Sequence, residues 1–200
     1  MHCPNSGSML GCSDPGSHVM YSRSANPNRK YPHTLELVRS GNIWVGVNTS
    51  LTNKLVREAM ENGVIKEFGM LDAISQEVKT SDNTRLDFLL KRNGRTIFME
   101  VKNCSLAENR VAMFPDAVTA RGTKHLNELA ALKRQGHKAA VFFCVQRQDA
   151  DSFMPAIHID PLYAATLAKV AKEGVLVIAY QAEVSPEEIK ITRRLHVKLE

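Results

Sequence analysis

Two neighbouring stretches, "RLDFLL" (residues 85–90) and "IFMEVKN" (residues 97–103), decide the fold of this chain. Both are apolar runs of strand length, yet Asp87 lies near the start of the first, and Glu100 and Lys102 lie near the end of the second. The polar turn "RNGR" between them contains Asn-Gly, a strong hairpin signal. In such a hairpin Asp87 lies roughly opposite Glu100 and Lys102, whose i, i+2 spacing puts both side chains on one face.

These charged side chains fit a site for phosphate chemistry. Two carboxylates held close together repel each other unless a cation or a shared proton compensates, and Mg²⁺ or Mn²⁺ at Asp87 and Glu100 would do so. Lys102 beside them could orient or deprotonate an attacking water. Glu77, on the preceding predicted strand, is a candidate third acid. The alternative is an internal ion pair of Lys102 with Asp87 or Glu100 that needs no metal, and the spacing alone leaves both interpretations open.

The bulk composition limits the class of protein. The 200 residues are 44% apolar and 24% charged, which suits one sizeable core, or a small domain packed on a medium one. No run approaches the ~18 apolar residues of a membrane span, and the start lacks a signal-peptide pattern. Four cysteines lack paired spacing, which argues against a zinc site and against secretion: Cys3, Cys12, Cys104 and Cys144. We therefore expect a cytoplasmic protein that does not contact a membrane.

The net charge of +5 is unevenly distributed along the chain. Residues 79–138 carry twelve Lys or Arg and six Asp or Glu, so this segment contains the whole positive surplus. A concentrated surplus favours an anionic partner such as DNA, although a solvated charged surface is the alternative. The candidates for phosphate contacts in this segment are Arg85, Arg121, Lys124 and His125.

The chain divides into two parts at about residue 48. Residues 1–47 are rich in Ser, Gly, Asn and Pro and contain about three predicted strands, at 18–22, 34–39 and 43–47. Residues 48–200 alternate between helical and strand patterns, in this order: a helix ending near 63, strands at 73–79, 85–91 and 96–103, a helix at 117–135, a strand at 138–146, a helix at 160–174, and strands at 175–180 and 189–199. This order predicts an α/β (α+β) domain, a mixed sheet flanked by helices.

The predicted helix at 117–135 begins with basic residues. Arg121, His125 and Glu128 recur at i, i+4 and i+7, so they should form one polar ridge opposite the leucines. Lys124 adds charge there, and Asp116 is a candidate cap for the helix. Such a ridge beside a carboxylate cluster suits contacts to a phosphate backbone. A solvated face with internal Arg121–His125–Glu128 contacts is the alternative.

Several stretches together resemble the sugar fermentation stimulation protein A (SfsA) family along essentially the full length. The stretches that carry the resemblance are "HCPNSGSM" (2–9), "VNTSLTNKLV" (47–56), "TRLDFLL" (84–90), "MEVKNCSL" (99–106), "FPDAVTARGTKHLNEL" (114–129) and "HIDPLYAATLA" (158–168). The resemblance implies a small N-terminal OB-like β domain (1–47) and a C-terminal PD-(D/E)xK nuclease-like domain (48–200). It also implies sequence-non-specific DNA binding and a regulatory role in sugar (maltose) metabolism.

The resemblance also assigns residues. Matched position by position, the nuclease-type acids fall on Glu77, Asp87 and Glu100, and the nuclease-type lysine falls on Lys102. The family's RGxKHL helix matches at Arg121, Lys124 and His125.

The N-terminal part departs from the family pattern. Family members usually start some tens of residues earlier, and an OB fold needs five strands where this sequence predicts about three. We therefore expect an incomplete, truncated barrel, whose exposed edge could pair two chains into a homodimer. Tyr21 and Tyr31 remain candidates for stacking on bases, whereas Trp44 is expected in the core.

Three functions follow as hypotheses. The first is a DNA-binding protein that contacts phosphates without reading base sequence. The second is a Mg²⁺- or Mn²⁺-dependent DNA endonuclease of the PD-(D/E)xK type. The third is a non-catalytic regulatory or interaction module, in which the acidic cluster only shapes the fold.

Overall fold

The computed structural model describes residues 1–81 and 84–199. Its helices are α1 (Thr52–Glu61), α2 (Ala120–Arg134) and α3 (Pro161–Lys172), with short 3₁₀ turns η1 (Thr49–Leu51) and η2 (Lys66–Phe68). The strands are β1 (Val19–Arg23), β2 (His33–Ser40), β3 (Ile43–Gly46), β4 (Ala73–Ser81), β5 (Thr84–Arg92), β6 (Arg95–Cys104), β7 (Leu106–Glu108), β8 (Val111–Phe114), β9 (Lys138–Val145), β10 (Ser152–Pro155), β11 (Leu176–Val184), β12 (Ile189–Arg194) and β13 (His196–Val197). No helix among the described residues is both long and apolar enough to cross a membrane.

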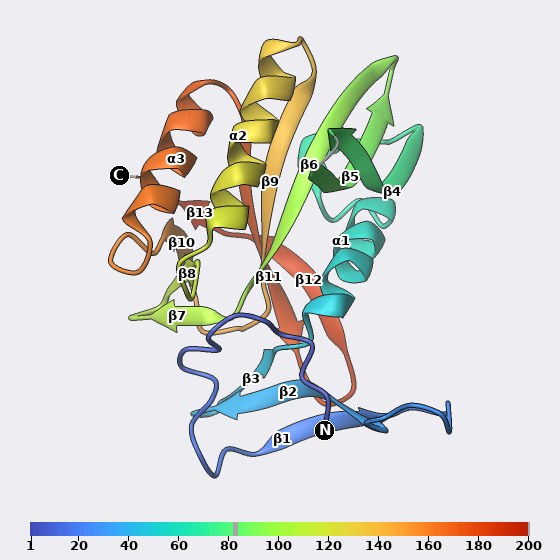
Figure 1. Cartoon of the computed structure of the whole chain (residues 1–200), viewed down its shortest axis with the longest axis vertical. Coiled ribbons are helices and arrows are strands. Elements are labelled where there is room, and N and C mark those ends of the chain that lie inside the picture. The colour runs from blue at the N-terminus through green and yellow to red at the C-terminus, as the bar shows by residue number, and fades with distance from the viewer. Residues whose placement is uncertain (82–83, 200) are drawn as a thin grey trace.

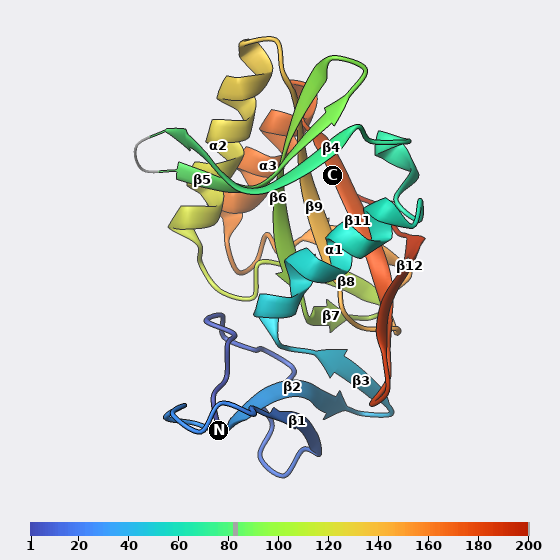
Figure 2. The same ribbon diagram turned by 90° about the vertical axis from the view of Figure 1, so that its right-hand side faces the viewer.

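A six-stranded mixed sheet forms the centre of the molecule. Its strand order is β12-β11-β9-β6-β5-β4, in which β6, β9 and β11 run parallel and the outer strands pair antiparallel. Helices α2 and α3 cover one face (Figure 1). Figure 2 shows α1 in front of the opposite face. This arrangement confirms the predicted mixed sheet flanked by helices.

The central sheet separates two hydrophobic cores. On one face Leu129 and Leu167 of the helices pack on the side of the sheet that contains Phe143, and on the other Val56 packs on the side that contains Phe142. Because Phe142 and Phe143 are consecutive residues of β9, their side chains point to opposite faces, and both are fully buried. A strand buried on both faces explains the continuous apolar run in the sequence.

The hairpin of β5 and β6 forms as the Asn-Gly pair predicts. Arg92 pairs with Arg95 across a two-residue turn in which Asn93 has a φ of 49° and Gly94 a φ of 71°. Positive φ at both positions matches the twist of the flanking strands. The ladder ends at the Phe88–Met99 pair, so the next position along each strand holds one of the two acids, Asp87 and Glu100.

A second sheet, in the order β13-β10-β8-β7, was missed by the sequence analysis. Its strands have two to four residues each, too few to show an alternating pattern. The single strand expected at 189–199 is also wrong, because this stretch forms two strands, β12 and β13, in different sheets. Leu195 is buried in the core under α2 and α3 and its N–H bonds to the Ala179 carbonyl at 2.8 Å, which separates β12 from β13.

The N-terminal strands β1, β2 and β3 form a three-stranded antiparallel sheet below the central sheet (Figure 1). The two sheets are joined where the Gly46 N–H donates to the Gln146 carbonyl at 2.9 Å. Trp44 is half-buried and packs against the core under α1, as expected, while Tyr21 and Tyr31 are exposed. The N-terminal sheet therefore lies close to the C-terminal end of β9.

Candidate functional site

Asp87 occupies the point where β5 and β6 separate. Its Oδ2 accepts the Val101 backbone N–H at 2.8 Å, and its Oδ1 accepts the Asn53 side-chain N–H from α1 at 2.9 Å. Burial raises the pKa of Asp87, and the neighbouring Glu100 charge raises it further. The carboxylate is thus held in a fixed orientation beside a second acid.

Glu100 lies on β6 with only 3% of its surface exposed. Its Oε1 accepts from Lys102 Nζ at 2.6 Å and from His125 Nδ1 on α2. Burial acts to raise the pKa of Glu100, but the hydrogen bond from His125 and the Lys102 charge together outweigh it, so the pKa is lowered. Glu100 is therefore held as a buried carboxylate, and the ion pair that the sequence left open as an alternative does form with Lys102.

The second carboxylate oxygen of Glu100 is Oε2. Oε2 is buried, and among the described residues no hydrogen-bond donor reaches it. An unpaired buried carboxylate oxygen next to another acid is unfavourable unless a cation compensates. No group of three or more His, Cys, Asp or Glu side chains in the described part of the chain forms a ligand cluster. Two carboxylates suit Mg²⁺, which commonly takes one or two and keeps waters or phosphate oxygens for the rest.

Asp87, Glu100 and Lys102 line a hollow of about 380 Å³, which we call the acidic hollow. Thr52 and Asn53 of α1 form one wall, and the end of β8 with the following loop (residues 113–119) forms another. Arg121 lies at the rim. The structure thus brings three acids (Asp87, Glu100 and Asp116), one lysine and one arginine to a shared cavity of the size of a small-ligand pocket.

Glu77 is not brought to the other two acids. It is exposed on β4, its φ of 55° marks an irregular position in the strand, and it does not line the acidic hollow. Its Oε2 lies 3.1 Å from Arg85 Nη1 on β5. The predicted strand position was right, but the irregular backbone and the pairing with Arg85 place Glu77 apart from the acidic cluster.

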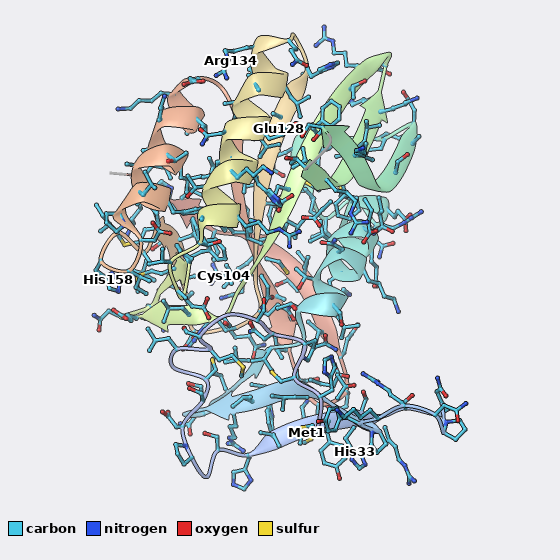
Figure 3. The ribbon with its side chains drawn as sticks, viewed as in Figure 1. Met1, His33, Cys104, Glu128, Arg134 and His158 are labelled. Carbon is cyan, nitrogen blue, oxygen red and sulfur yellow. The ribbon has the colours of Figure 1, made fainter. Side chains whose placement is uncertain are left out.

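The first turns of α2 differ from the expected polar ridge. His125 is 5% exposed and faces the sheet, whereas Arg121 and Lys124 are exposed and Glu128 is half-buried (Figure 3 shows Glu128 midway along α2). The ridge prediction is wrong for His125, because the helix face that covers β6 includes position 125 along with the leucines. His125 instead bonds Glu100, so it belongs to the acidic cluster.

The cap of α2 is Thr119, not the expected Asp116. The Thr119 hydroxyl accepts the Gly122 N–H at 3.0 Å, and the helix begins at Ala120. Asp160, which caps α3, also accepts the Thr119 N–H at 2.8 Å. Asp116 instead accepts the Met9 N–H at 2.8 Å.

A shallow basic groove adjoins the acidic hollow. It lies between the end of β4 and the start of β5 on one side and the start of α2 on the other, and Arg121 lines both cavities. The charged residues along this groove, which we call the basic groove, are Lys79, Arg85, Arg121, Lys124 and His125. Four of the five are Lys or Arg, so the groove presents positive charge beside the two acids.

Sequence reasoning missed Asn53 and the N-terminal residues Asn5, Ser6 and Gly7, all of which line the acidic hollow. Asn53 reaches Asp87 across 34 positions, and residues 5–7 reach the cavity from the opposite end of the chain. No local spacing connects residues so far apart. The only sign was that both segments lie in stretches that carry the resemblance.

Comparisons with known proteins agree along the whole chain. Residues 50–188 match the family model described as "Sugar fermentation stimulation protein RE domain", and residues 1–47 match "SfsA N-terminal OB domain". Both matches support the fold class expected from the sequence.

Individual relatives cover most of the chain. A sugar fermentation stimulation protein homolog from Desulfotalea psychrophila is 54% identical over 184 residues, covering 92% of this chain and 78% of the relative. The homolog from Pelobacter propionicus is 53% identical over 199 residues, covering 100% and 86%. The solved structure of Pyrococcus furiosus SfsA in complex with Ca²⁺ matches with a TM-score of 0.91 and 26% identity, covering 98% of this chain and 84% of that one. The chain belongs to the sugar fermentation stimulation protein (SfsA) family.

Proposed function

We propose that this protein binds DNA through its phosphates, without reading base sequence, and that its nuclease-like domain holds Mg²⁺ or Mn²⁺ at Asp87 and Glu100. The observation that carries the proposal is the unpaired, buried Glu100 Oε2 beside Asp87, in a hollow that opens next to a basic groove. The similar SfsA of Pyrococcus furiosus was solved in complex with Ca²⁺, which supports a divalent ion here as well.

Phosphate contacts are assigned to the exposed cations of the basic groove. Arg85, Arg121 and Lys124 project from two elements that border the groove, so a nucleic-acid backbone lying in it would meet charge from both sides. Contacts of this kind fix position and carry no base information. His125 is removed from this set, because its buried side chain is directed to Glu100.

DNA binding is tested by titrating the protein into a fluorescent 20-base-pair duplex at several salt concentrations. Binding through phosphates predicts a linear fall of log affinity with log salt, by ~0.9 for each duplex phosphate neutralised. Arg121→Ala should reduce that slope by about 1. Arg57→Ala, an exposed arginine on α1 that pairs with Glu61, should leave it unchanged. Affinity that does not depend on salt would contradict the proposal.

Metal-dependent DNA cleavage is the second candidate, favoured by the joint presence of Asp87, Glu100 and Lys102 in one hollow. A bound divalent ion would stabilise charge on the phosphate and activate a water. Asn53 and the Val101 N–H orient Asp87, and His125 and Lys102 hold Glu100. The Lys102 ammonium would also offset charge on a phosphate bound beside it.

Plasmid nicking with added Mn²⁺ tests cleavage. Asp87→Ala and Lys102→Ala should each abolish nicking, whereas equal rates in both variants and the parent would point to a contaminating nuclease. If DNA binding persists and none of the proteins cleaves plasmid or single-stranded DNA, the protein is a binding module. If the parent protein neither binds nor cleaves DNA and the alanine variants are only less stable, the third hypothesis, an interaction module, is supported.

Three broader statements remain proposals. A regulatory role in sugar (maltose) metabolism rests on the family alone. Action in the cytoplasm is supported by the four cysteines, which are free thiols in the structure. A homodimer is supported by β1, an edge strand whose five residues are all exposed, because such an edge can pair with a second copy. Sedimentation of the purified chain tests the last of these.

A further inference from the structure

The segment Pro4–Met9, which we call the strap, crosses the acidic hollow. Just before it, His2 is fixed to β2, since its N–H donates to the His33 carbonyl at 2.7 Å and its own carbonyl accepts the Leu35 N–H at 2.8 Å. Figure 3 shows Met1 and His33 next to each other at this point, and in Figure 1 the N-terminal segment arches from there towards the central sheet. The strap is therefore anchored before it reaches the hollow.

Both ends of the strap are bonded to opposite walls. At one end the Thr49 hydroxyl, in η1 just before α1, donates to the Pro4 carbonyl at 2.9 Å. At the other end the Met9 N–H donates to Asp116 Oδ2 at 2.8 Å, and the Ser8 hydroxyl donates to the Asp116 carbonyl. The bonds join the α1 wall to the loop that leads into α2, across the mouth of the cavity.

The middle of the strap forms part of the cavity lining. Asn5, Ser6 and Gly7 line the hollow together with Asp87 and Glu100. A Cβ atom on Gly7 would lie 2.7 Å from both Asp116 carboxylate oxygens, so the strap approaches the wall more closely than any side chain would allow. The strap thus forms one side of the hollow.

The basic groove adjoins the hollow at α2. The basic groove shares Arg121 with the hollow and is lined by no strap residue, so a nucleic-acid strand lying in the groove can approach the hollow at Arg121 without crossing the strap. A duplex places a second strand beside the first, across a groove ~6 to 12 Å wide, so a site with the strap along one side leaves less room for it. A cavity of about 380 Å³ with the strap along one side matches a single strand instead.

Val118 adds an apolar contact at the same mouth. Its side chain is 76% exposed and lines the hollow, next to polar neighbours. An apolar side chain at that place suits the face of an unstacked base, which single-stranded DNA presents and a paired duplex does not.

We propose that the strap makes this site selective for single-stranded DNA, including the single-stranded end of a duplex. The inference rests on the proposed DNA binding and names its substrate class. One strand lies in the basic groove, a phosphate reaches Asp87 and Glu100, and the strap excludes the second strand.

The test compares the affinities of a fluorescent single-stranded 20-mer, a blunt duplex of the same sequence and a duplex with a single-stranded tail. The parent protein should bind the single strand and the tailed duplex at least about tenfold more tightly than the blunt duplex, roughly the effect of 1.4 kcal/mol. The double variant Thr49→Val, Asp116→Ala removes bonds at both ends of the strap and should bring this ratio close to one, by a gain in duplex binding.

Two controls keep the result interpretable. Asp14→Ala removes the same charge from an exposed position outside the strap and should leave the ratio unchanged. Thr49→Val alone removes one hydrogen bond and should lower the ratio in the same direction even if the double variant unfolds. Equal affinity for single strand and blunt duplex in the parent, or an unchanged ratio in the strap variants, overturns the inference while salt-dependent DNA binding survives. Absence of binding to all three probes overturns both proposals.

Discussion

At the scale of single residues, the two buried carboxylates have opposite surroundings. Burial and the Glu100 charge raise the pKa of Asp87 against its hydrogen bonds from an amide and a backbone N–H. Burial also acts to raise the pKa of Glu100, but the His125 hydrogen bond and the Lys102 charge outweigh it and lower the pKa. Sequence spacing predicted that these acids would be neighbours, because the hairpin register alone determines it. It could not predict His125 as a partner, since that contact depends on how α2 is rotated over the sheet.

The contact between His125 and Glu100 should stabilise the fold measurably. His125→Ala removes a buried hydrogen bond to a charged group, so the free energy of unfolding should fall by about 1–3 kcal/mol. Urea unfolding followed by circular dichroism measures the change. Arg121→Ala, one turn earlier on the same helix and exposed, should change it by no more than roughly 0.5 kcal/mol. Similar effects of the two substitutions would contradict a specific role for His125.

The charged Asp87 carboxylate should destabilise the folded protein when no metal is bound. Because its pKa is raised in the folded state, the charged form is disfavoured there, so the cost is present at pH values above the folded pKa and disappears as the pH falls below 3.8. In EDTA at pH 7, Asp87→Asn should therefore raise the free energy of unfolding by about 0.5–2 kcal/mol. The gain should vanish near pH 3.5. A loss of stability at pH 7 would contradict the account.

At the scale of elements, the sequence predicted the β5–β6 hairpin and the long central strand β9, because turn residues and apolar runs are local signals. It missed the strap and the small second sheet. The strap is held by bonds to Thr49 and Asp116, more than 40 and 100 positions away, and the strands of that sheet are too short to show a period. Elements that depend on distant partners leave little trace in one sequence.

The pairing of Glu77 with Arg85 predicts an effect on DNA affinity. Glu77→Gln removes the carboxylate that pairs with Arg85 and leaves this arginine, which lines the basic groove, available to phosphate. Because exposed ion pairs contribute up to ~1 kcal/mol, DNA affinity at low salt should rise by about two- to fivefold. Glu183→Gln, exposed on β11 near the opposite edge of the central sheet, is the matched control and should have a smaller effect. A drop in the DNA affinity of Glu77→Gln would show that Arg85 does not contact the DNA phosphates.

At the scale of the whole molecule, the N-terminal sheet and the central sheet pack closely enough to unfold together. The backbone of Gly46 touches the buried Gln146 side chain, and a Cβ atom at position 46 would clash with the Gln146 amide. The composition shift near residue 48 predicted two parts, but the contact between them could not be predicted, since it joins positions a hundred residues apart.

Gly46→Ala should therefore destabilise the protein by about 1–3 kcal/mol through overpacking. The single tryptophan, Trp44, reports on this interface, so its fluorescence and far-UV circular dichroism should give coincident urea transitions in the parent. Gln146→Ala relieves the clash, and the double variant should be less destabilised than the sum of the single variants. If the two substitutions instead destabilise the protein additively, the alanine at position 46 does not clash with the Gln146 side chain.

The central claim is that Asp87 and Glu100 together hold one divalent ion. Calorimetric titration of Mn²⁺ into the parent protein at pH 7 tests it most directly. The account predicts one site per chain, with affinity lowered at least ~10–100-fold in Asp87→Ala and in Glu100→Gln and unchanged in Glu77→Gln, which lies outside the acidic hollow. Equal Mn²⁺ binding by the parent and Asp87→Ala, or loss of binding in Glu77→Gln, would contradict it.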